Sequence, residues 1–378
     1  MQTKSVNWKK LNILQVYDLL QHDKDFFDLY RTLLSKKKSK YDSNDKIVIL
    51  HNDTEFFYYD AKIGFSIHNL LTCWQQADIP WHVLLIITNH YNYGQIIRES
   101  RRFHPTDSPT VVFSMINSVS YNDIKKISNK GDIANKKIQK FALFLAGGIV
   151  RSHRTAFVKW LEHKTLTDKI VLSYNTSRDK KKQKQSKHLD YSKNNNISTD
   201  KSLNTVTANL HRINENFLSD NYDLFESWID QPLQRMDNKM LSDDPSTFYN
   251  CCFLDIVTET VFKYPYPFIS EKILRPMLLQ TPFIVFGAAG TLQCLQHNGF
   301  QTFDDFWDES YDKVQDNGLR FLKICSIIEQ LSSLSLDDLN TMYNSMLPIL
   351  RHNRIHMLQY IENVYKPSIN HVKINDYN

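Results

Sequence analysis

A carboxylate and an ammonium group stand side by side in Glu271 and Lys272, at the expected start of a short helix. Ser270 precedes them and is a favoured N-cap residue, whereas Pro276 should shorten or kink the helix. The carboxylate of such a pair can accept hydroxyl groups of a ribose or another sugar. The ammonium group and the helix N-terminus can hold a pyrophosphate. The pair therefore suits a nucleotide sugar, and an ordinary surface ion pair is the alternative.

Glu259 lies at the end of the apolar segment CFLDIV (residues 252–257), which has the composition of a buried strand. In a parallel sheet, the strand ends and the starts of the following helices share one edge. We therefore expect Glu259 to converge with Glu271 and Lys272, and we take it as a candidate catalytic carboxylate.

A second group of charged residues, Arg151, His153 and Arg154, lies in the segment GGIVRSHRTAF, between a predicted strand and the helix after it. Cations at such a turn can bind phosphate through bidentate guanidinium hydrogen bonds. Positive charge opposes the helix dipole there, so an unliganded cluster would be somewhat unfavourable. These three residues are candidate donor-binding residues, and a solvated helix start is the alternative.

The loop after the first predicted strand carries His51, Asp53 and Glu55. An acidic or imidazole group at this position could act as a general base towards an acceptor hydroxyl. We take Asp53 and Glu55 as the better candidates, because His51 could merely cap the strand end. An exposed polar loop would give the same pattern.

Other catalytic patterns are missing from the sequence or incomplete in it. The segment FGAAGTLQCL (residues 286–295) supplies two glycines and a possible threonine N-cap, but it lacks the lysine of a Walker loop and the spacing of a dinucleotide fingerprint. The only Asp-x-Asp pair, Asp23 and Asp25, falls in an expected N-terminal helix rather than at a strand end. No metal or other cofactor is therefore expected.

Apolar strands and amphipathic helices alternate along both halves of the chain. The first half contains strand-like runs at residues 46–50, 81–88 and 110–115, with a helix after Ser66. This alternation is typical of a parallel sheet covered on both faces. We predict an α/β protein with two Rossmann-like domains, the first of which spans residues 1–135.

The second Rossmann-like domain is expected at residues 136–335, followed by a helical segment at residues 336–378. The strands expected there are residues 141–146, 169–174, 252–257 and 282–286. The helices are expected to begin near residues 151, 271, 291 and 318. Residues 178–205 are rich in Lys, Asn and Ser and are predicted to be a solvated, flexible insertion.

The composition is that of a folded protein and gives no signal for a nucleic-acid partner, a membrane partner or a zinc site. The 378 residues, 42% of them hydrophobic, can fill two domain cores. The formal charge of +5 is small for this length and demands neither nucleic acid nor membrane as a partner. The five cysteines form no zinc pattern and indicate a reducing compartment, so we expect a cytoplasmic protein without a transmembrane segment.

Two segments resemble a set of viral and bacterial glycosyltransferase-like proteins of the phage and large algal virus type. The first is FALFLAGGIVRSHRTAFVKWLEHKTLTDKIVLSY at residues 141–174, and the second, at residues 249–312, contains TETVFKYPYPFISEKILRPMLLQTPFIVFGAAG. More distantly, Glu259 and FISEKI resemble the donor-site motif of α1,3-fucosyltransferases and other GT-B enzymes. The resemblance implies a GT-B-like fold and a host-cytoplasmic location if the protein is viral.

The resemblance also implies roles for single residues. Arg151 and Lys272 would bind the donor phosphates, Glu271 the ribose or sugar, and Glu259 would sit beside the sugar. The implied activity is metal-independent transfer from a nucleotide sugar to a glycan, lipid or protein hydroxyl. One departure is LAGG (residues 145–148), which stands where the family pattern has Leu-Asn-Arg and so lacks a polar and a basic residue.

Two rival functions are compatible with the same sequence. The LAGG departure (residues 145–148) favours a non-catalytic binding or virion-associated protein that keeps the glycosyltransferase fold. The lysine-rich insertion at residues 178–205 is the basis for a nucleic-acid-associated protein, which would show a steep dependence of binding on salt. The absence of regularly interleaved aromatic residues in the insertion counts against nucleic-acid binding.

Overall fold

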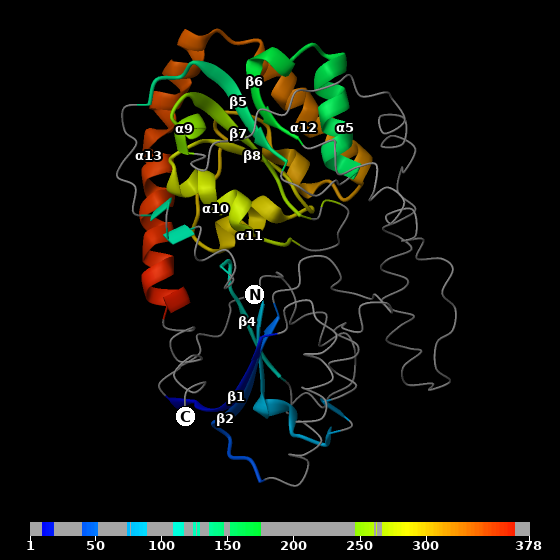
Figure 1. The fold of residues 1–378 in the computed structure, drawn as a ribbon, viewed down its shortest axis with the longest axis vertical. Helices are drawn as coiled ribbons and strands as arrows, with labels where there is room; N and C mark the ends of the chain where they lie inside the picture. Colours follow the sequence, from blue (N-terminus) through cyan, green and yellow to red (C-terminus); the bar gives the residue numbers. More distant parts are fainter. Residues whose placement is uncertain are drawn as a thin grey trace, which may run out of the picture.

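The structure is a computed structural model of the chain, and it places many of the predicted elements (Figure 1). The residues that the structure describes are 10–18, 40–51, 74–75, 77–88, 109–116, 124–125, 127–128, 136–146, 152–174, 246–260, 262 and 267–366. The predicted insertion at 178–205 and the Asp-x-Asp pair lie outside these residues.

Four parallel strands form the first sheet, in the order β1-β2-β3-β4. They are β1 (Asn12–Asp18), β2 (Asp45–His51), β3 (Leu84–Thr88) and β4 (Thr110–Phe113). The last three confirm the predicted strands, and the 3-10 turn η2 (Trp81–Val83) occupies the start of the run predicted as strand at 81–88. The edge strand β1 was not predicted, because its alternating pattern NILQVYD lacks the continuous apolar run by which the other strands were recognised.

The second sheet is also parallel and has the order β6-β5-β7-β8. Its strands are β5 (Lys140–Leu145), β6 (Ile170–Ser173), β7 (Cys252–Thr258) and β8 (Phe283–Phe286), which confirms all four predicted strands. The chain leaves β5 towards β6 on one side, and β7 lies on the other side of β5. The carboxyl ends of β5 and β7 therefore form the point at which the strand order reverses, where open α/β sheets bind ligands.

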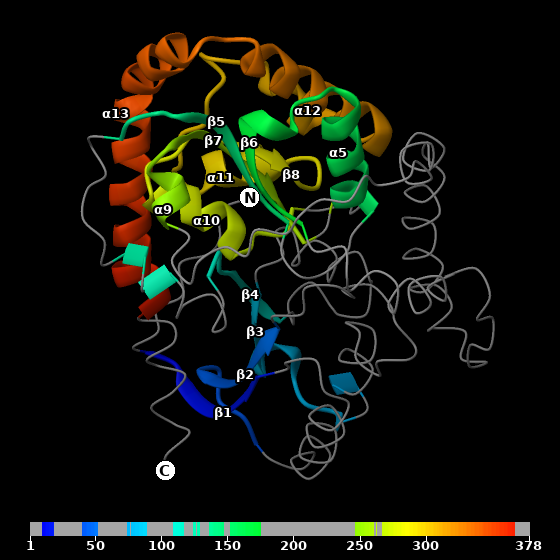
Figure 2. The ribbon, with the colours of Figure 1, turned by 45° about the horizontal axis from the view of Figure 1, so that its top comes forward.

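Helices cover both faces of the second sheet, with α5 (Ser152–His163) and α12 (Asn317–Ser332) on one side. On the other side lie α9 (Ser246–Tyr249) and α10 (Glu271–Leu278), as Figures 1 and 2 show. Aromatic rings pack between the sheet and the helices on the α5 side. The ring centroid of Phe286 in β8 lies 4.7 Å from that of Phe157 and 5.6 Å from that of Phe321. Burial of each such side chain contributes about 1.5–3 kcal/mol.

The helix after β8, α11 (Thr291–His297), is terminated as predicted but begins differently. Gly299 follows the helix with a φ of 88°, a conformation that favours glycine and confirms the predicted C-terminal cap. The predicted threonine N-cap was wrong, because Gly290 is the N-cap residue. The Asp312 carboxylate instead accepts hydrogen bonds from the amides of Leu292 and Gln293, at 2.9 and 3.0 Å.

The last helix, α13 (Leu336–Tyr360), continues into a π-helical turn (Ile361–Tyr365), and the part of the helical segment predicted at 336–378 that follows residue 366 lies outside the described residues. It begins in a capping box formed by Ser335 and Asp338. The Tyr343 hydroxyl donates to the carbonyl of Gln280 after α10, at 3.0 Å. At the other end, the Tyr360 hydroxyl accepts the Met115 amide just beyond β4, at 3.1 Å. Thus α13 connects the two sheets.

The described part of the chain is therefore an α/β structure with two parallel sheets, as expected for Rossmann-like domains. Two further 3-10 turns, η3 (Thr167–Lys169) and η4 (Glu309–Lys313), precede β6 and α12. Among the described helices, none is long and apolar enough to cross a membrane.

Candidate functional site

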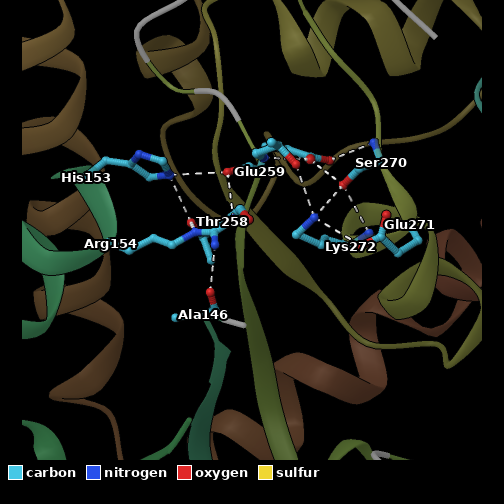
Figure 3. Close-up of polar contacts among 9 residues, drawn as sticks. Ala146, His153, Arg154, Thr258, Glu259, Ser270, Glu271 and Lys272 are labelled. Atoms are coloured by element: carbon cyan, nitrogen blue, oxygen red, sulfur yellow. Dashed lines mark hydrogen bonds and ion pairs between the residues drawn. The ribbon is translucent and has the colours of Figure 1, made fainter. Parts of the chain in front are cut away.

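Arg154 lies at the carboxyl ends of β5 and β7, where the strand order reverses. It projects from the first turn of α5, and the residue is only 3% exposed. The guanidinium donates to the Ala146 carbonyl at 2.7 Å and to the Thr258 hydroxyl at 3.1 Å. It also donates to the carbonyls of Thr258 and Glu259, both at 3.3 Å. Arg154 thus joins two neighbouring strand ends to the helix that follows β5 (Figure 3).

His153, the other predicted phosphate ligand in the described part of α5, is also buried. Its Nε2 lies 3.1 Å from the Thr258 hydroxyl and 3.2 Å from the Glu259 carbonyl oxygen. The imidazole stacks on Phe262, with ring centroids 5.4 Å apart. His153 and Arg154 therefore hold the backbone around Glu259 in place. Their predicted role in phosphate binding stays a prediction.

Glu259 is completely buried and forms the link from β7 to α10. One carboxyl oxygen accepts the Ser270 amide at 3.1 Å. The other accepts the Ser270 hydroxyl at 2.5 Å and the Thr260 amide at 3.2 Å. Three donors of this kind satisfy a buried carboxylate that would otherwise be costly to remove from water.

Lys272 and Glu271 are the accessible members of the site. Their side chains are 21% and 26% exposed, and the Lys272 ammonium lies 3.0 Å from the Glu271 carboxylate. The ammonium also donates to the hydroxyls of Thr260 and Ser270, at 3.2 and 3.3 Å. Ser270 is the N-cap residue of α10, as predicted, and its hydroxyl accepts the Lys272 amide. The structure therefore brings Glu259, Glu271 and Lys272 together.

Burial and neighbouring charge act differently on the two carboxyl groups. Burial raises the pKa of Glu259, and the Lys272 ammonium and the Ser270 hydroxyl offset this only in part. For Glu271 burial also opposes ionisation, but the Lys272 ammonium and its hydrogen bond outweigh burial and lower the pKa. Glu271 is thus the group held as an anion, while Glu259 is the group that burial pushes towards protonation.

Three predicted site residues lie outside the described residues. They are Arg151, which precedes α5 in the sequence, and Asp53 and Glu55, which follow β2 in the sequence. Their predicted roles in phosphate binding and as a general base stay predictions. His51 ends β2, and its backbone pairs with Thr88 of β3.

Sequence reasoning missed a buried arginine behind the candidate site. Arg320 of α12 donates to the carbonyls of Gly287 and Phe262, at 3.2 and 2.8 Å. Its guanidinium lies 4.4 Å from the centre of the Phe262 ring, and burial lowers its pKa to about 10. The sequence carried a signal for this buried arginine. Arg320 lies four residues after Asp316, at a helical position that is expected to face the core.

A second buried polar cluster, which sequence reasoning also missed, lies on the α9–α10 side of the sheet. The Tyr249 hydroxyl donates to the Asp255 carboxylate at 2.6 Å, and the Lys136 amine donates to the Thr281 hydroxyl at 3.0 Å. Burial raises the pKa of Asp255 to about 7 and lowers the pKa of Lys136 to about 7. Asp255 sits inside an otherwise apolar strand, which was the signal in the sequence.

The described residues contain no group of three or more His, Cys, Asp or Glu side chains that could hold a metal ion. The cation available at the candidate site within these residues is the Lys272 ammonium. Comparisons of the chain with protein families, with curated proteins and with solved structures find no match.

Proposed function

We propose that the chain is a GT-B-like glycosyltransferase that moves a sugar from a nucleotide-sugar donor to an acceptor hydroxyl without a metal ion. The donor would bind at the second sheet, and the acceptor would approach from the first domain. The proposal extends the sequence resemblance of residues 141–174 and 249–312 to the viral and bacterial glycosyltransferase-like set.

The observation that carries the proposal is the position of the Glu271–Lys272 pair. It lies at the N-terminus of α10 and is joined through Ser270 to the end of β7, beside the reversal of strand order. Both side chains keep about a quarter of their surface exposed in a region where the other charged groups are buried. An accessible acid–base pair at this edge of a parallel sheet is suited to a ligand with hydroxyls and phosphates.

We assign a separate role to each residue of the candidate site. The Glu271 carboxylate would accept ribose or sugar hydroxyls, and the Lys272 ammonium would stabilise the departing nucleotide diphosphate. Glu259 has no exposed surface, so in this conformation it would act through Ser270 rather than touch the sugar. A base from the first domain, for which Asp53 and Glu55 remain the candidates, would deprotonate the acceptor hydroxyl.

The proposal is tested by measuring the binding of nucleoside diphosphates and nucleotide sugars by thermal shift. A ligand at about 100 times its dissociation constant stabilises the folded state by about 2.7 kcal/mol. Lys272→Ala should weaken binding of a nucleoside diphosphate by about 10- to 150-fold, because it removes a charge-assisted hydrogen bond of about 1.5–3 kcal/mol.

Nucleoside binding should change little in this variant, since the nucleoside lacks the phosphates. Lys323→Ala is a matched control on the exposed surface of α12, where the ammonium lies 3.0 Å from the Ser310 hydroxyl and 3.9 Å from the Asp308 carboxylate. Equal losses for nucleoside and nucleoside diphosphate would contradict the assigned role of Lys272. Failure of every nucleotide and nucleotide sugar to bind would refute the proposed function.

A non-catalytic binding protein is the second candidate, and the buried cations favour it. His153 and Arg154 point to backbone and hydroxyl oxygens at the strand ends, so two predicted phosphate ligands are engaged within the protein. Binding of a nucleotide sugar without turnover of donor, tested with a panel of glycan, lipid and protein acceptors, would support this candidate over the transferase.

A further inference from the structure

The Ser270 hydroxyl connects the buried Glu259 carboxyl to the accessible Lys272. It donates its single proton to Glu259 at 2.5 Å. The same oxygen accepts from the Lys272 amide and from the Lys272 ammonium, each at 3.3 Å. A hydroxyl has one donor and two acceptor sites, so this arrangement uses all of them.

The direction of these hydrogen bonds depends on whether Glu259 carries a proton. An ionised carboxylate can only accept, so it holds the Ser270 proton and leaves both acceptor sites for Lys272. A protonated carboxyl group must itself donate, and its nearest partner is the same Ser270 oxygen. Ser270 then has to turn its own proton away and gives up an acceptor site that Lys272 uses.

We propose that Glu259 is a positioning residue whose proton controls the placement of Lys272, and so the affinity of the candidate site for an anionic ligand. This inference rests on the proposed function, because it assigns a regulatory step to the same site. Glu259 acts through Ser270 and does not touch the ligand.

The surroundings of Glu259 are suited to such a switch. The carboxyl group has no exposed surface, and Ser270 is 2% exposed, so water does not replace the lost partner. From α10, Lys272 favours the carboxylate and Glu271 opposes it, while burial, the largest effect, raises the pKa of Glu259. From α5, His153 and Arg154 contact the Glu259 carbonyl oxygen and keep the peptide fixed while the side chain changes its charge.

The first experiment measures binding of a nucleotide sugar by titration calorimetry as a function of pH. The diphosphate of a nucleotide sugar has no monoester group, so its charge stays constant in the range used. The wild type should lose about tenfold in affinity between about pH 8 and the pH at which Glu259 is protonated. Glu259→Gln, in which the amide donates to Ser270 as the protonated acid would, should bind weakly at every pH.

Glu309→Gln is the matched control, because Glu309 is a half-buried carboxyl group whose pKa is also raised by burial, and it accepts the Phe303 amide at 2.9 Å, away from the candidate site. It should keep the wild-type pH profile. If Glu259→Gln does not fold, Ser270→Ala takes its place and should remove the pH dependence. Retention of the wild-type profile in Glu259→Gln or Ser270→Ala overturns the proposal.

A second experiment needs no ligand and separates this inference from the proposed function. Burial raises the pKa of Glu259 above 4.5, so the wild type should lose stability relative to Glu259→Gln as the pH rises from 4.5 through the folded-state pKa. A constant difference in melting temperature over this range means that Glu259 does not titrate there and overturns the switch. If no nucleotide sugar binds at any pH, the proposed function fails, whereas this comparison still tests the titration of Glu259 on which the switch depends.

Discussion

Replacement of Arg154 by methionine would distinguish a structural arginine from a ligand-binding one. The residue is only 3% exposed, and its guanidinium donates to four oxygen atoms at the ends of β5 and β7. Two of these hydrogen bonds, at 2.7 and 3.1 Å, have the usual length of N–H···O hydrogen bonds, and we assign a full energetic contribution to these two. Hydrogen bonds to a charged group contribute about 1.5–3 kcal/mol each, and removing one partner of a buried charged interaction typically costs about 3–5 kcal/mol, so Arg154→Met should destabilise the fold by about 3–5 kcal/mol.

For a domain of this size, 1 kcal/mol corresponds to roughly 2–4 °C, so the melting temperature should fall by about 6–20 °C. Differential scanning calorimetry measures the change, and Arg351→Met, the same substitution at an exposed position of α13, should leave the melting temperature nearly unchanged. An unaltered melting temperature for Arg154→Met, together with lost nucleotide binding, would refute the structural role and restore the phosphate-binding prediction.

Three further predictions concern pH, backbone conformation and metal ions. Burial lowers the pKa of Lys136 from 10.5 to about 7, so the unfolded chain binds more protons between these values. The wild type should therefore gain up to about 3 kcal/mol of stability, measured by urea unfolding, as the pH rises from about 7 to about 9.5, and Lys136→Met should lack this gain. Gly299→Ala should destabilise by about 1–3 kcal/mol in thermal unfolding, because the φ is positive and the new Cβ would lie 2.7 Å from His356 Nε2; His356→Ala in the same chain should recover the steric part and leave the backbone part. A chelator should leave any transferase activity nearly intact in a donor-turnover assay, whereas loss with recovery on manganese or magnesium would point to Glu259 or the Asp304–Asp305 pair as ligands.

Much of the second domain could be predicted from the sequence because its signals are local. Its strands are apolar runs of strand length, and its helices repeat apolar residues at helical spacing. Ser270 and Gly299 act at helix ends, where a cap depends on residues only a few positions away. The strand β1 was missed because an edge strand with polar residues gives only a weak local signal.

The candidate site was predictable to the extent that one sheet edge collects strand ends and helix starts. That rule predicts that Glu259, Glu271 and Lys272 lie at one edge, and the structure brings the three side chains together there. The rule does not say which of them is buried. Exposure separates Glu259, which is enclosed, from the accessible Glu271–Lys272 pair, and exposure depends on packing across the whole domain.

Local patterns in the sequence specify most strands and helices of this protein and several of their ends, because periodicity and capping act over a few residues. The order of the strands and the partners of the long polar side chains were decided by the tertiary structure. Arg154 reaches oxygens more than 100 positions away because β7 lies next to β5, and Asp312 replaces Thr291 at the start of α11 because η4 folds back onto it. Such side chains choose their partners by proximity in space, and no local pattern records that proximity.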